Sequence, residues 1–242
     1  MQRHLRLVLV VFGLTSFTLT PSQAAKHEDR HAEQFVQTIA GQGFEIIDNP
    51  NWSADQKRQR FRKLMGQHIA FRLFGRSALG PYARIPSKQQ FGAYVDLLKE
   101  YAAYAMQSQL NEYKGQAIRV LSSRVKDSGR LSYVSVNSEV YDRASGKVEG
   151  TAKWLLIRRL DQRSSGDAAS LGGMRKTEAS TGGDAQYKVY DLVLQTAGES
   201  ASFSLLQTQR DEFTAILSRH QRQFDALLAH IKEQIRKIQE PD

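Results

Sequence analysis

The sequence contains no cysteine. The chain therefore forms no disulfide bond, whatever its compartment, and it has no thiolate that could bind a metal or act as a nucleophile. After residue 24, no stretch approaches the roughly 20 apolar residues that a membrane-spanning helix needs. No internal repeat is visible either. These absences leave a chain that has to be stabilised by one ordinary hydrophobic core.

Catalytic and metal-binding motifs are also lacking. None of the six histidines has the spacing of a metal-ligating motif. The stretch "GESAS" places Ser202 where a nucleophile elbow needs glycine. The stretch "GGMRKT" places Arg175 where a phosphate-binding loop needs glycine before Lys176. We therefore expect no catalytic residue, no metal site and no cofactor.

Asp191 is the one acidic residue that needs a separate explanation, because it lies inside an apolar segment. An unpaired carboxylate would be costly there. We expect it to be paired with an arginine or with backbone N–H groups. The alternative is a catalytic aspartate that works with a tyrosine, as in small cone-shaped α+β enzymes.

The first 24 residues predict a secretory signal peptide. Arg3 and Arg6 give a basic start, and an apolar run from residue 7 to 19 follows. Ser22 and Ala24 then stand at the positions that signal peptidase requires. The alternative is an uncleaved membrane anchor, but the segment is short and its flanks are those of a cleaved signal. We expect an exported domain of residues 25–242.

The chain is basic, with 34 lysines and arginines against 25 acidic residues and a net charge of +9. A basic surface often indicates nucleic acid. Since an exported protein does not meet nucleic acid, anionic lipid head groups become the favoured polyanion. One candidate surface is a helix face formed by Lys57, Arg58, Arg60, Arg62 and Lys63. It faces either solvent or a membrane.

Helices are predicted on both sides of a central region. Ser53 with Gln56, and Ser87 with Gln90, form capping boxes that start two helices. The first is expected to continue through an apolar stripe of Phe61, Leu64, Met65, His68 and Leu73. The second is aromatic on its buried side and runs to about residue 113. Between them, Gly80 and Pro81 break the helical pattern. Two further helices follow residue 203.

From residue 116 the apolar period changes from 3.6 to 2, which predicts strands. Short links at 126–129 and 142–146 fit hairpins, so the sheet should be antiparallel. Shared faces are expected for three sets of residues: Val134, Val136 and Val140; Ala152, Trp154 and Leu156; and Tyr190, Leu192 and Leu194. Val189, Asp191 and Val193 should lie on the opposite face of the last strand.

The expected fold class is α+β, with N-terminal helices, a curved antiparallel sheet of four to five strands, and C-terminal helices that return to cover one sheet face. The segment 162–186 is rich in Gly, Ser, Ala and Thr and is expected to be a flexible insertion. The sheet face and the aromatic helix share a surplus of apolar residues. This surplus forms either a closed core or a core held open for an apolar ligand.

Two segments of the sequence resemble the MlaC family, whose members are also called toluene-tolerance proteins. The first is "ALGPYARIPSKQQFGAYVDLLKEYAAYAM", in which Leu79, Gly80, Tyr82, Phe91 and Tyr94 match the family pattern. The second is "YKVYDLVLQTAGESASFSLLQTQRDEFTAIL". The matching residues there are Tyr190, Asp191, Gly198, Ser200, Gln209 and Phe213. The order of signal peptide, helices, sheet and helices also agrees. The 162–186 insertion lengthens a hairpin that is usually short in the family.

The resemblance implies a periplasmic, soluble carrier of phospholipid that helps to maintain the lipid asymmetry of the outer membrane. Its partners would be phospholipid, an inner-membrane ABC transporter complex and an outer-membrane lipoprotein complex, with transient membrane contact and without nucleic acid. Such a carrier is not an enzyme and needs no cofactor. Alternatives are a carrier of another lipid such as a hopanoid, a small periplasmic enzyme using Asp191, and a ligand-free adaptor.

Together, the apolar surplus and the resemblance predict a pocket for acyl tails. Its expected lining is Leu79, Tyr82, Tyr94, Leu98, Tyr101, Val134, Val136, Trp154, Leu156, Tyr190, Leu192 and Leu194. Gly80 and Pro81 would re-aim the chain so that Tyr82 and Ile85 line or gate the mouth of this pocket. Net transfer should be near balance, because lipid tails are already dry in a bilayer.

Overall fold

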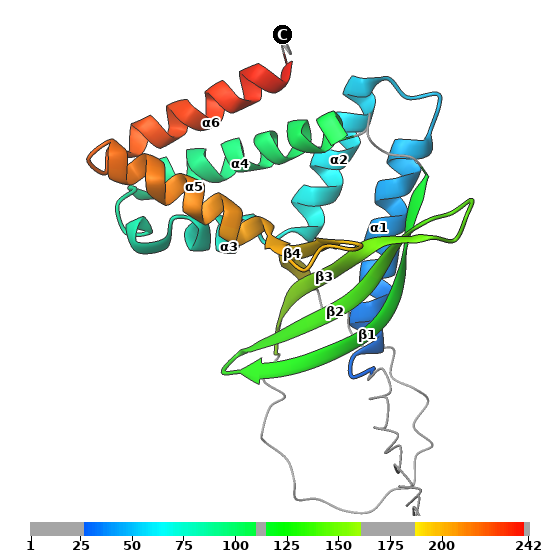
Figure 1. Cartoon of the computed structure of the whole chain (residues 1–242). Helices are drawn as coiled ribbons and strands as arrows, with labels where there is room; N and C mark the ends of the chain where they lie inside the picture. Colours follow the sequence, from blue (N-terminus) through cyan, green and yellow to red (C-terminus); the bar gives the residue numbers. More distant parts are fainter. Residues whose placement is uncertain (1–26, 110–114, 161–186, 240–242) are drawn as a thin grey trace, which may run out of the picture.

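The structure is a computed structural model that describes residues 27–109, 115–160 and 187–239. The elements in these ranges are α1 (Arg30–Asp48), α2 (Ala54–His68), α3 (Phe71–Ala78), η1 (Gly80–Tyr82), α4 (Lys88–Gln109), β1 (Gln116–Ser128), β2 (Leu131–Asp142), β3 (Val148–Arg159), β4 (Lys188–Thr196), β5 (Phe203–Ser204), α5 (Leu205–Arg219) and α6 (Phe224–Gln239). The predicted α+β class is confirmed. Helices α3 to α6 form one part of the molecule, and the curved sheet with α1 forms the other (Figure 1).

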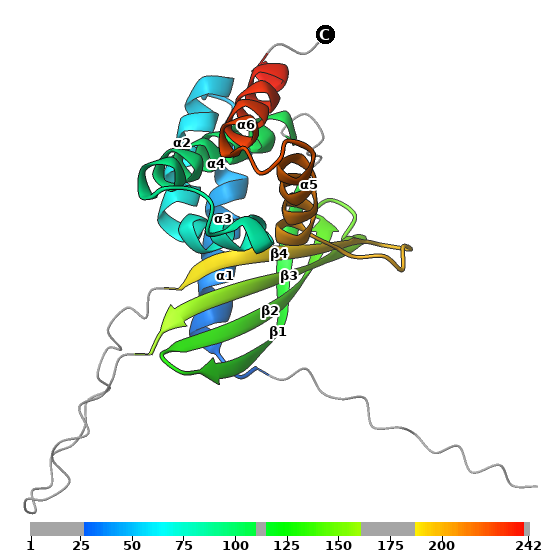
Figure 2. The ribbon, with the colours of Figure 1, turned by 90° about the vertical axis from the view of Figure 1, so that its left-hand side faces the viewer.

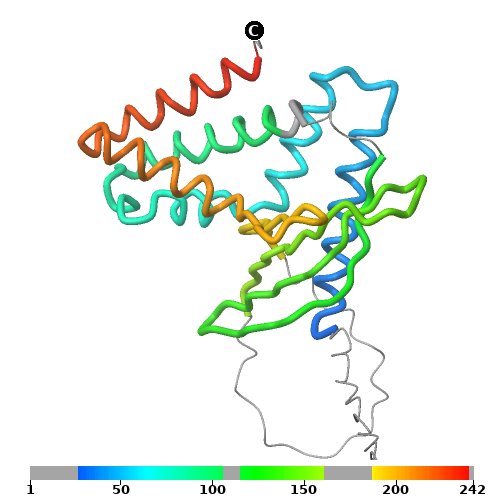
Figure 3. Tube along the Cα trace, viewed as in Figure 1, coloured from blue at the N-terminus to red at the C-terminus, as the bar shows by residue number. Residues whose placement is uncertain are grey.

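The sheet is antiparallel, and its strands lie in sequence order from β1 to β5. Helix α1 crosses one side of it and lies mainly over β1 and β2. In Figure 2 the strands lie in front of α1, and α3 and α5 lie above β4. We call the side against α1 the inner side of the sheet and the opposite side the outer side. Figure 3 follows the chain from α1 to the end of α6.

Both predicted capping boxes are present. The Ser53 hydroxyl accepts from the Gln56 N–H at 3.2 Å, while the Gln56 side chain accepts from the Ser53 N–H at 2.9 Å. Ser87 and Gln90 repeat this reciprocal pair at the start of α4. Each box satisfies N–H groups that have no partner within their own helix. These two helix starts are therefore determined by residues three positions apart.

The predicted continuous helix through residue 73 is wrong. It is divided at Ile69 and Ala70, where Ile69 forms a β-bridge with Val189 and the Ala70 N–H donates to the Val189 carbonyl at 2.8 Å. These interactions replace hydrogen bonds of a continuous helix, and the chain changes direction there. As a result, Phe71 is buried, whereas Leu73 is 37% exposed.

The expected face of Tyr190 is also wrong, because a β-bulge interrupts the register between β3 and β4. Leu155 pairs with Asp191, but Leu156 pairs with Val189, so Tyr190 is the extra residue. The bulge reverses the alternation. Val189 therefore shares the inner side with Leu192 and Leu194, while the Tyr190 ring contacts Tyr133 on the outer side at a centroid distance of 6.0 Å.

Two hydrophobic clusters stabilise the fold. The helical core lies among α3 to α6 and includes Leu79, Tyr94, Phe213 and Leu227. The sheet core lies between α1 and the inner side of the sheet. Ile69 packs against both clusters. The helix break at this residue is thus one of the points where the two parts of the molecule join.

Some predictions concern residues that the structure does not describe. The signal peptide at 1–24 and the insertion at 162–186 lie outside the described residues, as does the predicted end of the aromatic helix near residue 113. Among the described helices, none combines the length and the apolar character needed to cross a membrane.

Candidate functional site

The predicted pocket residues are divided between the two cores. Leu79, Tyr94 and Leu98 are buried in the helical core, and Tyr82 and Tyr101 pack against it partly exposed. The sheet core contains the buried residues Val134, Val136 and Leu156, with Trp154 half-buried against it. The bulge places Tyr190 on the outer side. The common chamber predicted for all of these residues remains a prediction.

The sheet surface beneath α1 is closed. Val134 is 1% exposed, and Val136 and Leu156 are 0% exposed. They pack with α1 residues that include Val36 and Ile39. An acyl chain would reach these three residues only if α1 moved away from the sheet. In this structure their contacts stabilise the fold.

Beside this closed surface, the inner side of β3 and β4 carries an apolar strip that is only half-buried. The strip consists of Trp154, Leu192 and Leu194, where Trp154 is directly opposite Leu192 and Ala152 is opposite Leu194. Helix α1 lies mainly over β1 and β2, whereas α3 and α5 contact β4. The strip therefore lies between α1 on one side and α3 and α5 on the other.

Exposed apolar side chains extend the strip at its β5 end. Phe203 pairs with Leu194 and is 48% exposed, and Leu205 at the start of α5 is 43% exposed. The next residue, Leu206, packs against the helical core. Exposed or half-buried apolar side chains are thus found on β4, on β5 and at the start of α5, with Ser204 between Phe203 and Leu205. Apolar side chains gathered in this way are typical of an interaction site.

Tyr101 contributes a half-buried side chain from α4. Burial raises the pKa of its hydroxyl, and the nearby charge of Glu212 raises it further. Tyr101 therefore stays neutral at physiological pH. An aromatic ring with one polar end suits a boundary between apolar tails and water.

Asp191 has a structural role. Its Oδ1 accepts from the N–H groups of Leu192 at 2.8 Å and Leu206 at 2.9 Å, and its Oδ2 accepts from the Ser204 hydroxyl at 2.7 Å. The predicted pairing with backbone donors is confirmed. The carboxylate fixes the start of α5 to β4, beside the apolar strip.

A hollow of about 290 Å³ lies at β2, β3 and β4, and its lining combines outer-side residues with Ala152 and Leu194 of the inner side. Among the side chains around it are Asn137, Lys153 and Val193, which lie opposite one another in the strand register. Thr151 and Gln195 add further polar groups. The volume is at the lower limit for small-molecule pockets, which span about 300–1,000 Å³. Its lining is mixed, because Leu121, Val193 and Leu194 stand beside these polar groups.

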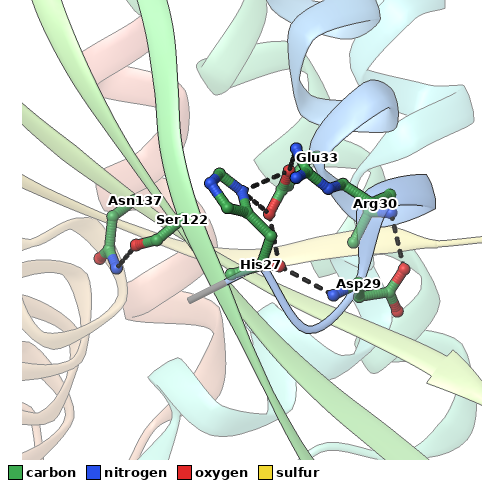
Figure 4. Close-up of polar contacts among 8 residues, drawn as sticks. His27, Asp29, Arg30, Glu33, Ser122 and Asn137 are labelled. Carbon is green, nitrogen blue, oxygen red and sulfur yellow. Dashed lines mark hydrogen bonds and ion pairs between the residues drawn. The ribbon is translucent and has the colours of Figure 1, made fainter. Parts of the chain in front are cut away.

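A buried polar cluster at the start of α1 was missed by sequence reasoning (Figure 4). Nδ1 of His27 lies 2.9 Å from Oε1 of Glu33, and the Ser123 hydroxyl donates to the same oxygen at 2.6 Å. The Asp29 N–H donates to Oγ of Ser123 at 2.9 Å. Because Ser123 donates to a carboxylate rather than to a histidine, the cluster is not a nucleophilic triad. It anchors α1 to β1.

The described residues contain no group of three or more His, Cys, Asp or Glu side chains that could hold a metal ion. The candidate site is the apolar strip with the helical surface next to it, because its apolar side chains are only half-buried. Sequence reasoning found its three strip residues from their alternation, but it grouped them with deeper core residues on the same face.

The fold and the strip define an α+β protein with an incompletely covered apolar sheet surface. Residues 31–152, about half of the chain, match the family model described as MlaC protein. The chain belongs to the MlaC family. It is also similar in structure to a phospholipid-binding protein from Ralstonia solanacearum, which was solved in complex with a phospholipid. The TM-score is 0.61 at 15% identity, covering 86% of this chain and 99% of that one. No curated protein matches the chain.

Proposed function

We propose that this protein is a periplasmic carrier that binds phospholipid and moves it between membrane complexes. The observation that carries the proposal is the half-buried apolar strip of Trp154, Leu192 and Leu194 beside the helical core. Membership of the MlaC family supports it, as does the similarity in fold to a phospholipid-binding protein.

Acyl tails would lie between the strip and the helical core. The two cores are separate clusters joined at Ile69, so a small movement between them would widen this space. Tyr82 and Tyr101 would then meet the tails from the helical side. The deeper predicted residues Leu79, Tyr94, Leu98, Val134, Val136 and Leu156 would support the pocket walls without touching the ligand in the closed state.

The energetics of transfer favour a carrier over an irreversible binder. Burial of one methylene stabilises by about 0.8 kcal/mol, so two acyl chains with roughly 30 methylenes gain about 20 kcal/mol or more relative to water. Extraction from a bilayer loses nearly the same free energy, because the tails were already buried there. Net transfer is close to balance. Direction would then come from the inner-membrane ABC transporter complex and the outer-membrane lipoprotein complex.

The connection after α3 supplies the proposed mouth. Gly80 has φ +52°, a left-handed conformation that glycine adopts readily, and η1 begins at this residue. Tyr82 packs against the helical core, and Ile85 is 38% exposed. The change of direction at Gly80 thus places one side chain on the core and another at the surface.

The test uses protein purified without detergent from the periplasm of its own source. Organic extraction and mass spectrometry should find phospholipid at a fixed ratio to protein. Protein consistently free of lipid would refute the carrier function. If the extracted lipid contains no phosphate, the cargo is another lipid, such as a hopanoid.

A matched pair of variants locates the site. Leu192 and Val193 are neighbours on opposite sides of β4, and both are half-buried. Leu192→Asp should remove most of the copurified lipid, because it places a charge on the strip. Val193→Asp should retain it. Equal lipid content in the two folded variants would show that the strip is not the site.

A further inference from the structure

The free end of the helical part is formed by two chain connections that lie together. The α3–α4 connection and the α5–α6 turn meet at the end of the helices away from β4 (Figures 1 and 2). The Gln90 side chain donates to Oδ1 of Asp225 at 3.3 Å, and the rings of Tyr94 and Phe224 are 5.7 Å apart. Residues far apart in the sequence thus share one surface.

This surface is strongly basic. Residues 76–90 and 219–225 contain five lysines and arginines but one acidic residue, Asp225. All five cations are exposed. We call them, together with Ile85, the basic tip: Arg76, Arg84, Lys88, Arg219 and Arg222. Among the described residues, no acidic side chain forms an ion pair with any of these five.

The cations of α2, which the sequence suggested as a membrane-facing patch, differ in this respect. The Lys57 ammonium donates to the Ile47 carbonyl at 2.6 Å, and Arg58 pairs with Asp55 at 2.7 Å. The Arg60 guanidinium lies 3.7 Å from the centre of the Trp52 ring. Three of the five α2 cations are therefore engaged by the protein itself. In the basic tip the same criterion counts one of five, since the Arg76 guanidinium lies 4.8 Å from the centre of the Phe91 ring, and the tip is the better candidate for an external anion.

An apolar side chain lies within the tip. Ile85 is 38% exposed, directly follows Arg84 and precedes Lys88 by less than one helical turn. Exposed aliphatic side chains among unpaired cations are typical of surfaces that bind the head-group region of a membrane. The cations attract anionic head groups, and the aliphatic group enters the boundary with the acyl chains.

We propose that the basic tip is a docking surface for a bilayer that contains anionic phospholipid. The proposal extends the proposed carrier function and rests on it in one respect, since a carrier has to reach a lipid surface. Docking would place the connection with Tyr82 against the membrane, next to the proposed mouth. An acidic protein surface is the competing partner.

The test measures binding of the full mature protein to vesicles by co-sedimentation. Vesicles of phosphatidylcholine with phosphatidylglycerol are compared with vesicles of phosphatidylcholine alone. The double variant Arg84→Gln/Arg222→Gln should bind the anionic vesicles about 25-fold more weakly, because each cation near an anionic surface contributes about fivefold. Raising the salt concentration should weaken wild-type binding, since it screens these charges.

A matched control distinguishes binding at the basic tip from an effect of the net charge of the protein. Arg124 and Lys126 are exposed on β1, and this strand belongs to the sheet part of the molecule, whereas the tip belongs to the helical part (Figure 1). Arg124→Gln/Lys126→Gln changes the net charge equally and should weaken binding less than about threefold, an effect smaller than the loss of one cation at the surface. Ile85→Ser should weaken binding without changing the charge.

Three outcomes would overturn the proposal: equal loss in the tip and control variants, equal binding to neutral and anionic vesicles, or no binding of the wild-type protein to anionic vesicles. The last would leave an acidic protein surface as the competing partner. Copurified lipid is measured on the same samples. A tip variant that keeps its lipid but loses vesicle binding separates this proposal from the carrier function, and absence of lipid from every sample would count against the carrier function alone.

Discussion

Two parts of the same sheet side differ in how they are covered. Beneath α1, Val136 and Leu156 are fully buried. One or two strands further on, Leu192 and Leu194 are equally apolar but only half-buried. Composition does not distinguish the two parts. Their difference comes from the helices: α1 lies mainly over β1 and β2 and shares a cluster with Leu156 of β3, whereas α3 and α5 contact β4.

The comparison separates residues that stabilise the fold from residues available to a ligand. A fully buried side chain contributes its whole transfer free energy to folding. A half-buried one contributes less, and its remaining surface can be covered by a ligand. Stability and lipid content should therefore respond to different substitutions.

The largest effect is expected for Leu156→Ala, at the closed part. Removing a fully buried leucine side chain costs about 2–5 kcal/mol of the free energy of unfolding, because transfer free energy is lost and a cavity remains. Urea denaturation of the variant and the wild type measures the difference. A loss below about 1 kcal/mol would mean that the sheet core rearranges to fill the space.

The second prediction concerns alkaline pH and tests whether both cores are closed. Burial raises the pKa of Tyr94 in the helical core and of Tyr187 in the sheet core, where Asp29 raises it further. Both stay neutral in the folded state, whereas they ionise near pH 10 when unfolded. The stability they provide is present below about pH 10 and is lost as pH rises above it, by about 1.4 kcal/mol per pH unit for each tyrosine.

Absorbance of the phenolate during an alkaline titration measures this effect. Part of the tyrosine signal should develop only together with unfolding. Tyr187→Phe should remove the contribution of one tyrosine from the slope of the unfolding free energy against pH. Complete tyrosine ionisation near pH 10 in folded protein would show that the cores are open to water.

Asp191→Ala is expected to cost about 1–3 kcal/mol, because it leaves the N–H groups of Leu192 on β4 and Leu206 on α5 without their acceptor. The matched control is Asp211→Ala, at an exposed position on α5, which should stay within about 0.5 kcal/mol of wild type. Thermal and urea unfolding measure both. Equal stability of the two variants would show that Asp191 does not anchor α5.

The smallest stability effect is expected for Leu192→Ala, at about 1 kcal/mol or less, because the side chain is only half-buried. Its effect on copurified lipid should be larger than that of Leu156→Ala. The two variants together form the sharpest test of the comparison. If Leu192→Ala destabilises as much as Leu156→Ala, the strip belongs to the core.

Features determined by nearby residues could be predicted from the sequence. The capping boxes of Ser53 and Ser87 depend on partners three residues away, and the hairpins depend on short links. The alternation of β2 and β3 correctly placed Val134, Val136, Trp154 and Leu156 on one face. The cost of an unpaired carboxylate in an apolar segment also predicted that Asp191 would accept hydrogen bonds.

Features determined by distant residues were missed. The break between α2 and α3 arises from bonds of Ile69 and Ala70 to Val189, and the bulge at Tyr190 arises next to it in the same strand. The sequence carries no signal for either contact. The division of the predicted pocket residues between two cores has the same cause, because periodicity identifies an apolar face but not the element that covers it.

The anchoring of α1 has a consequence for how the chain folds. Asp29 is bonded to Ser123, 94 residues later, and to the Tyr187 hydroxyl, 158 residues later. The first turn of α1 cannot acquire its final contacts until β1 and the start of β4 have formed. Contacts with such large sequence separation slow folding, because the intervening chain has to be ordered first. The earliest described residues are therefore among the last to reach their final positions.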